Sequence, residues 1–218
     1  MAIRILVVDD HKVFREGLRL LVAEEEDMEL VGESSNGQEA VELAESLNPD
    51  VILMDVSMPG LNGVEAARRI TERNGSVKVL ALSGYWSERF VMEMLKAGVC
   101  GYVVKDCSTL ELASAIRVVM AGERYLSPKA AKVLIENYMR SGEGGSEASL
   151  LDRLTPKERE LIQMLAEGRS SKEAARLLYV SIKTVDSRRR KIMKKLNVSS
   201  MAELTKFAVR EGITSIEF

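Results

Sequence analysis

Five short apolar runs, each followed by a helical pattern, constrain the fold of this chain more than any other feature of its sequence. Strand-length runs that alternate with helices predict a mostly parallel sheet with helices on both faces, joined by right-handed crossovers. The first part of the chain is therefore expected to be an α/β domain with a doubly wound, five-stranded sheet. The predicted strands are residues 3–8, 28–34, 50–55, 78–83 and 101–106, and the predicted helices start at residue 12 and then span residues 37–47, 63–73, 87–97 and 109–120.

The sequence changes character after residue 122. Ser127 and Pro128 favour a helix start and open a predicted connecting helix, residues 127–140. The stretch SGEGGSEAS that follows is too rich in Gly and Ser to pack, and predicts a flexible linker. The apolar positions of the connecting helix are Ala131, Leu134, Ile135 and Tyr138. The expected parts are a first domain, a connecting helix with linker, and a second domain, at residues 1–122, 123–149 and 150–218.

The second domain has no strand pattern and is expected to be all-α. Capping boxes, in which a Glu follows a Ser or Thr after three residues, are predicted at Thr155 and Ser200, and at Ser108 in the first domain. The tight turn between the second and third helices is typical of a helix-turn-helix. The four predicted helices are residues 155–168, 171–179, 182–196 and 200–210.

Composition argues against several classes of protein. No apolar run approaches the roughly 18 residues that suggest a membrane span, and the first residues lack the features of a signal peptide. We therefore expect a cytoplasmic protein without a membrane partner. The two cysteines form no CxxC, which disfavours a disulfide framework or a zinc site. The single histidine, His11, has no nucleophile motif near it and is expected to be a surface or helix-start residue without a catalytic role.

Charge is distributed unevenly along the chain. Residues 1–149 carry 16 basic and 24 acidic residues, a net charge of −8, whereas residues 150–218 carry 15 and 9, a net charge of +6. An acidic first part suits a bound cation, and a basic second part suits nucleic acid.

Polar side chains follow the predicted strands at their carboxyl ends, where ligands bind to a doubly wound sheet. Asp9 and Asp10 end the first strand, Asp55 the third, Ser83 the fourth and Lys105 the fifth. A single strand-end aspartate is more often a turn or cap residue, but polar groups at four strand ends together favour a site. Clustered carboxylates repel one another, and Mg²⁺ resolves that conflict. Asp55 could then attack a phosphoryl group and form an acyl phosphate, with the metal and Lys105 stabilising the transferring charge.

The motifs VVDD, VILMDVSMPGLNG and GYVVKD, with Ser83, resemble the receiver domain of bacterial two-component response regulators over about residues 1–122. The resemblance implies a flavodoxin-like fold in which Asp55 is phosphorylated and Lys105 contacts the phosphoryl group. It also implies that Ser83 is the switch hydroxyl and that Tyr102 is the switch aromatic, although ordinary strand packing explains Tyr102 equally well. The implied Mg²⁺ ligands are Asp9, Asp10, Asp55 and the backbone carbonyl of Ser57.

The third helix of the second domain has an apolar face and a basic face. A charged stripe is often merely solvated, but this one follows the turn of a helix-turn-helix, and RRRK at residues 188–191 puts charge where DNA phosphates would lie. The apolar face holds Ile182, Val185, Ile192 and Leu196. The residues predicted to contact DNA are Lys183, Thr184, Ser187, Arg188, Arg190, Lys191 and Lys194.

The motif LTPKERELIQMLAEGRSSKEAARLLYVSIKTVDSRRRKIMKKLNV resembles the LuxR-type DNA-binding domain, and the two halves together resemble the NarL/FixJ class of transcriptional response regulators. The resemblance implies that the basic face contacts DNA and that the helix at residues 200–210 supports dimerisation. Ser171, Asp186 and Arg188 stand where this pattern usually has Asn, Lys and His. Asp186 could accept a hydrogen bond from a cytosine amino group, or could repel phosphate and orient a neighbouring arginine. Base preference stays open.

The interpretation that follows is a transcription factor switched by Mg²⁺-dependent phosphorylation of Asp55. A sensor histidine kinase donates the phosphoryl group, and the active form is a homodimer on double-stranded DNA. The chain is not expected to be an enzyme beyond chemistry on its own Asp55. A phosphotransferase with an external substrate is the rival, disfavoured because position 57 is serine and offers no general base, and because no cap domain is evident. A receiver that works without phosphorylation is a second rival, which the full set of acceptor-site residues disfavours.

Overall fold

The computed structural model describes residues 2–84, 88–141, 150–151 and 153–214. The chain divides into two compact units, Met1–Glu143 and Gly144–Phe218. All of the predicted linker except Ser141 lies outside the described residues, as does residue 87 at the predicted start of one helix. No helix in the described ranges has the length and hydropathy required to cross a membrane.

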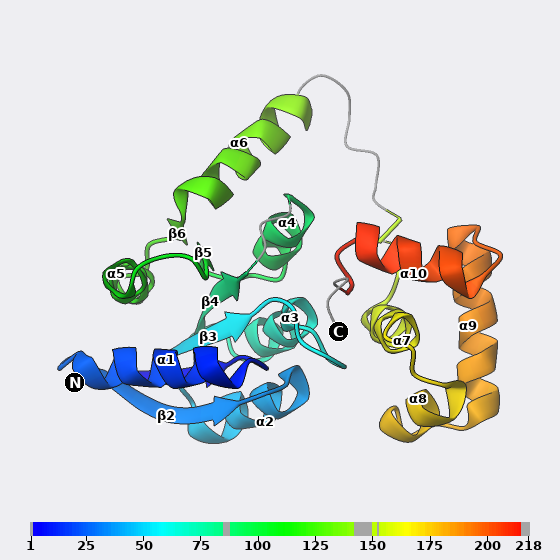
Figure 1. Ribbon diagram of the computed structural model, residues 1–218, viewed down its shortest axis with the longest axis horizontal. Helices are drawn as coiled ribbons and strands as arrows, with labels where there is room; N and C mark the ends of the chain where they lie inside the picture. The colour runs from blue at the N-terminus through cyan, green and yellow to red at the C-terminus, as the bar shows by residue number, and fades with distance from the viewer. Residues whose placement is uncertain (1, 85–87, 142–149, 152, 215–218) are drawn as a thin grey trace. The chain divides into compact units, whose positions relative to one another are not determined.

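The first unit is built on a parallel sheet with the strand order β2-β1-β3-β4-β5-β6 (Figure 1). Its first five strands confirm the predicted doubly wound α/β fold, but the sheet has six strands where five were predicted. The extra strand, β6, has two residues, too few for any periodicity to reveal. It lies close to β5 because Gly101 has no side chain: a Cβ there would be 2.8 Å from the Tyr125 carbonyl oxygen. The strands are β1 (Ile3–Val8), β2 (Met28–Ser34), β3 (Val51–Asp55), β4 (Lys78–Ser83), β5 (Gly101–Val104) and β6 (Tyr125–Leu126).

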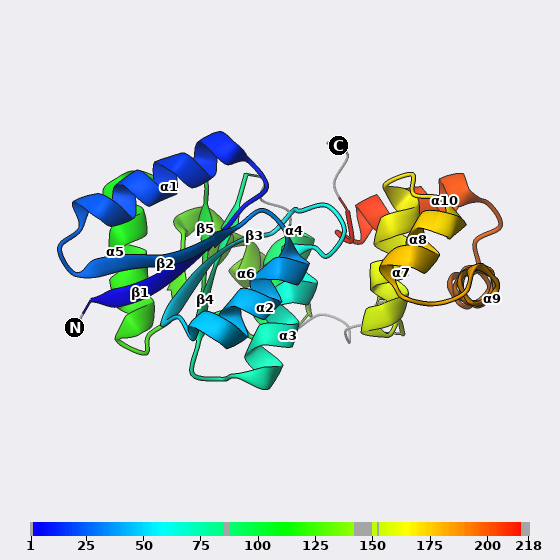
Figure 2. The same cartoon turned by 90° about the horizontal axis from the view of Figure 1, so that it is seen from below.

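Helices cover both faces of this sheet (Figure 2). Apolar residues of α1 and α5 form one core layer with side chains of the strands, and those of α2, α3, α4 and α6 form the other. All five residues of β3 are buried, as expected for a central strand covered on both faces. The helices are α1 (Lys12–Glu24), α2 (Gly37–Leu47), α3 (Gly63–Arg73), α4 (Glu88–Lys96), α5 (Thr109–Met120) and α6 (Pro128–Ser141).

The helix expected to connect the domains, α6, packs on the first unit, and only part of its predicted apolar positions take part in the packing. Ala130 and Val133 are buried in the core layer that contains α4. Ile135 and Tyr138, two of the predicted apolar positions, are instead 59% and 81% exposed. A backbone hydrogen bond just before α6 fixes where the helix starts and so which of its residues face the core. In this bond the Ser127 amide, which follows β6, donates to the Tyr102 carbonyl.

In the part of the second unit that the structure describes, four helices surround a separate apolar core (Figure 1). Thr155 forms the predicted capping box with Glu158, and Ser170 forms one that was not predicted, with Glu173. The boxes predicted at Ser108 and Ser200 are only half formed, because these side chains accept the expected backbone hydrogen bond but the reciprocal contact is not seen. At Ser200 the reason is visible: Glu203 accepts from Ser199 instead. The helices are α7 (Pro156–Ala166), α8 (Ser171–Leu177), α9 (Ile182–Leu196) and α10 (Met201–Arg210).

Candidate functional site

The strand-end side chains predicted to form a site converge at the carboxyl edge of the first unit's sheet. The Lys105 Nζ lies 2.6 Å from Asp9 Oδ2 and 3.0 Å from Asp55 Oδ2. The side chains of Asp9 and Asp55 are almost completely buried. The aliphatic side chain of Lys105 brings its ammonium group over the ring of Phe14, 4.6 Å from the ring centroid. The ammonium group of Lys105, which directly follows β5, therefore bridges two buried carboxylates, one after β1 and one at the end of β3.

Backbone contacts position Asp55 at the end of β3. The Val56 amide donates to the Leu82 carbonyl, and the Gly63 amide donates back to the Val56 carbonyl. Gly63 approaches the chain so closely that a Cβ there would lie 1.8 Å from the Asp55 carbonyl oxygen. Gly60, in the turn between β3 and α3, has a φ of 82°, in the left-handed region that favours glycine. The turn Met58-Pro59-Gly60 thus brings the chain back against the backbone of Asp55 and Val56.

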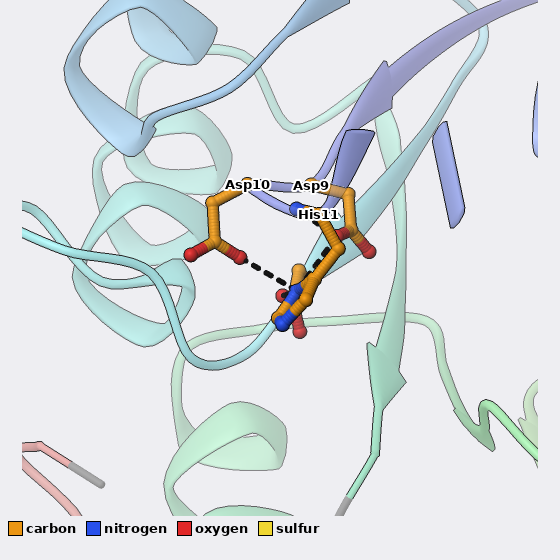
Figure 3. A group of neighbouring side chains, drawn as sticks. Asp9, Asp10 and His11 are labelled. Atoms are coloured by element: carbon orange, nitrogen blue, oxygen red, sulfur yellow. Dashed lines mark hydrogen bonds and ion pairs between the residues drawn. The ribbon is translucent and has the colours of Figure 1, made fainter. Parts of the chain in front are cut away.

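His11 belongs to the same cluster, although the sequence indicated only a surface or helix-start residue. It is the N-cap residue of α1, and its side chain is exposed to solvent on one side. Its Nδ1 lies 2.9 Å from Asp10 Oδ1 and 3.3 Å from Asp9 Oδ1 (Figure 3). One ligand atom from each of Asp9, Asp10, His11 and Asp55 can be chosen so that all lie within 4.8 Å of one another.

The carboxylates form an acidic pocket of the kind that binds Mg²⁺. Asp9 Oδ2, Asp10 Oδ1 and Asp55 Oδ2 are buried and accept no well-formed hydrogen bond from the described residues, although Lys105 and His11 lie near them. Burial raises the pKa of Asp55 to about 7, and the Asp9 charge adds to the rise while Lys105 opposes it. One lysine ammonium group cannot balance three neighbouring carboxylates, so the donor set suits a hard divalent cation.

Ser83 and Tyr102 lie on β4 and β5, the next two strands beyond β3 in the sheet. Ser83 ends β4 and is buried, and its side chain forms a hydrogen bond with the Tyr102 hydroxyl of β5. Burial raises the pKa of Tyr102 to about 12, the hydrogen bond from Ser83 opposes the rise, and the nearby Asp55 charge adds to it. The Lys105 amide donates to the Ser83 carbonyl at 2.8 Å. Asp55 is therefore linked to Lys105 by an ion pair, and Lys105 is linked to Ser83 through the backbone.

The basic face predicted on α9 is accessible to a partner. Lys183, Arg190, Lys191 and Lys194 are exposed, and Thr184, Ser187 and Arg188 are half-buried. Val185, Ile192 and Leu196 are buried as predicted, but Ile182 is 46% exposed, and its placement on the packing face was wrong. A helical wheel gives the angle of a side chain and not its position along the axis. Ile182 is the first residue of α9, and the core begins one turn later.

Asp186 makes contacts within the unit that the sequence did not reveal. Ser171 Oγ on α8 donates to Asp186 Oδ1 at 2.9 Å, and Arg189 Nη2 lies 3.5 Å from the same oxygen. Two of the three positions that depart from the usual LuxR-type pattern therefore contact each other. Elsewhere Lys195 of α9 pairs with Glu158 of α7 at 2.8 Å.

Family models match both units. Residues 5–117 match the response regulator receiver domain. Residues 152–208 match the bacterial regulatory proteins of the luxR family.

Curated relatives match nearly the whole chain. The transcriptional regulatory protein DegU of Brevibacillus brevis is 38% identical over 222 residues, which cover 96% of this chain and 94% of the relative. The nitrate/nitrite response regulator protein NarL of Escherichia coli K12 is 35% identical over 209 residues, 96% of each chain. A crystal structure of a LuxR-family two-component response regulator from Aurantimonas sp. SI85-9A1 is 34% identical, with a TM-score of 0.61, and the match covers 64% of this chain and 99% of that one.

Proposed function

The chain belongs to the NarL/FixJ class of two-component response regulators, with a receiver domain and a LuxR-type DNA-binding domain, and on that premise we propose that phosphorylation of Asp55 switches its binding to DNA. The domain limits proposed here are residues 1–122 and 150–218, with residues 123–149 between them. The observation that carries the proposal is the placement of the buried Asp55 carboxylate 3.0 Å from Lys105 and beside the hydrogen-bonded Ser83 and Tyr102 pair.

The proposed chemistry is transfer of a phosphoryl group to Asp55. Its carboxylate oxygen attacks phosphorus, the bond between phosphorus and the donor breaks, and an acyl phosphate forms. Lys105 is placed to stabilise the added negative charge. The hydroxyl of Ser83 then binds the phosphoryl oxygens in place of its contact with Tyr102, which makes Tyr102 the partner whose environment changes. We propose no turnover of an external substrate, so the chemistry is limited to phosphorylation and dephosphorylation of the chain itself.

We propose Mg²⁺ as the cofactor of this step. The residues that would hold it are Asp9, Asp10, Asp55 and the backbone carbonyl of Ser57, and the close grouping of the three carboxylates fits that role. When bound, the ion neutralises the mutual repulsion of the carboxylates and the charge of the transferring group. Because phosphorylation needs a donor, we propose a sensor histidine kinase as the partner, acting in the cytoplasm.

The proposed output is binding of a homodimer to double-stranded DNA through α9. We propose that the exposed basic residues of this helix contact phosphates and that Thr184, Ser187 and Arg188, which are half-buried, contact base edges. We propose α10 as the dimerisation element, following the family resemblance. A two-fold dimer favours paired half-sites on the DNA.

The test of the proposed function measures DNA affinity with and without phosphorylation. Duplexes that bind the full chain are first selected from a randomised pool, in Mg²⁺ and a small phosphodonor such as acetyl phosphate. We expect the phosphodonor to tighten binding of the wild type about tenfold or more and to leave Asp55→Asn unchanged, an effect typical of allosteric coupling. Equal affinity of the wild type with and without the donor, despite labelling of Asp55, would show that DNA binding is not controlled by this site.

Arg190→Ala is expected to weaken DNA binding. Arg190 is exposed on the basic face of α9, so its loss removes a phosphate or base contact, a change of about 1–3 kcal/mol. Affinity for the selected duplex is measured at several salt concentrations, and a lost phosphate contact also lowers the salt slope by about one. Arg153→Ala, which removes an exposed arginine just before α7, is the matched control. Unchanged affinity of Arg190→Ala at every salt concentration would remove this face of α9 from the interface.

A further inference from the structure

Asp186 is an acidic residue on the helix that we propose to contact DNA. A carboxylate facing DNA there would repel phosphates, unless it reads a base or is neutralised by a neighbour. Its side chain is 39% exposed, so both explanations are sterically open. The contacts of the carboxylate within the protein distinguish them.

The Asp186 carboxylate is held from two sides. Ser171 Oγ donates to its Oδ1 at 2.9 Å, and Arg189 Nη2 lies 3.5 Å from that same oxygen. The Asp186 backbone carbonyl also accepts from Arg190 Nε at 3.3 Å. Because Oδ1 accepts from Ser171 and faces a guanidinium group, contacts within the protein already fix the orientation of the carboxylate. Arg189 is also the cation of α9 that pairs with this carboxylate, so the two side chains orient each other.

Ser171 is itself fixed in position. It is the first residue of α8 and follows Ser170, whose capping box with Glu173 defines where that helix begins. The hydrogen bond from Ser171 therefore joins a defined helix start to the second turn of α9. Ala174, Ala175 and Val185 are buried in the same core cluster. The polar contact adds to this packing a directional restraint on the angle and rotation of α9 against α8.

We propose that Asp186 is a positioning residue: anchored by Ser171, it fixes α9 against α8 and orients Arg189, and it does not read a base. This inference rests on the proposed binding of DNA by α9. It assigns base readout to other residues of that helix, and it predicts that no single base pair is recognised through Asp186.

A double-mutant cycle on the full chain tests the proposal. Ser171→Ala breaks the contact without changing charge, and Asp186→Ala removes the carboxylate and keeps a residue with high helix propensity. The probes are a duplex selected from a randomised pool by the wild type and the set of its single base-pair variants. Ser171→Ala is expected to weaken binding about threefold to tenfold, by a similar factor for every duplex. In the Asp186→Ala background it is expected to have no effect, and Asp186→Ala is expected to keep the wild-type order of preference among the duplexes.

Two results would overturn the proposal. One is a loss of discrimination at one base pair, found with Asp186→Ala and not with Ser171→Ala, which would make Asp186 a base reader. The other is a DNA affinity that Ser171→Ala does not change in the wild-type background, or that it lowers by the same factor in the wild-type and Asp186→Ala backgrounds. The same cycle measured by denaturant unfolding of the second unit reports the contact without DNA. If the wild type selects no duplex, the proposed function fails. The unfolding cycle still tests the contact in that case, because an interaction energy between Ser171→Ala and Asp186→Ala shows that the contact restrains the helices and its absence shows that it does not.

Discussion

A small phosphodonor and Mg²⁺ are expected to add a phosphoryl group to the wild-type chain and none to Asp55→Asn. Asp55 combines the features needed of the acceptor: a buried carboxylate, an adjacent acidic pocket for a cation, and the Lys105 ammonium at 3.0 Å. Asparagine occupies nearly the same volume but lacks the nucleophilic oxygen. Intact mass measures the adduct, and its loss in hydroxylamine identifies an acyl phosphate.

Asp50→Asn is the matched control for this experiment. Asp50 precedes β3 at the opposite end of the strand that ends in Asp55, and its carboxylate accepts from the Arg4 amide at 2.9 Å, a contact that asparagine can keep. This variant is expected to label like the wild type. An adduct of equal yield on Asp55→Asn would place the acceptor elsewhere. Absence of any adduct on the wild type, while a control receiver is labelled, would leave the DNA-binding unit in place but require another switch.

The convergence of the acidic site could be predicted from the sequence because parallel strands bring their carboxyl ends to one edge of a sheet. Residues that end apolar runs far apart in the chain, such as Asp9, Asp55 and Lys105, therefore meet whatever the details of the loops. The same logic gives no rotamers. His11 was expected at a surface or a helix start, and it is the N-cap of α1. The sequence did not indicate that its ring turns toward Asp10.

Features that depend on contacts between distant segments could not be predicted from the sequence. The two-residue β6 exists because Gly101 lets the chain approach β5, and the buried face of α6 follows from where β6 ends. Periodicity reports only which residues share a face, so the apolar positions of this helix did not show that Ala130 and Val133 are buried and Ile135 is exposed. In the second unit, Ser171 and Asp186 were each recognised as unusual, but their pairing needed the angle between α8 and α9.

Asp55→Asn is also expected to stabilise the metal-free first unit, by an amount that grows with pH. Burial and the Asp9 charge raise the pKa of Asp55 from 3.8 to about 7, which means that ionising this carboxyl costs more in the folded unit than in the unfolded chain. Between these two pH values the folded state holds a proton that the unfolded state has released. The free energy of unfolding of the wild type therefore falls as pH rises from about 4 to about 7.

The size of this effect follows from the shift. A difference of about three pKa units corresponds to at most about 4 kcal/mol, and because Asp55 is coupled to Asp9 and Lys105 we expect about 1–4 kcal/mol. Asparagine does not titrate, so the free energy of unfolding of the variant does not fall with pH for this reason. The difference in free energy of unfolding between variant and wild type should be smallest near pH 4, widen up to about pH 7 and then level off.

Unfolding of the two units must be followed separately, because a chain with two units need not unfold in one step. Hydrogen exchange in denaturant, with a chelator present and read by mass spectrometry on peptides from residues 2–84 and 88–141, reports the first unit alone. A wild type that is as stable as Asp55→Asn at pH 7.5, or a difference between them that does not change with pH, would contradict the prediction. Added Mg²⁺ provides the internal control: an ion that binds only the folded state stabilises the wild type, and it should narrow the difference because Asp55→Asn lacks one of the proposed ligands.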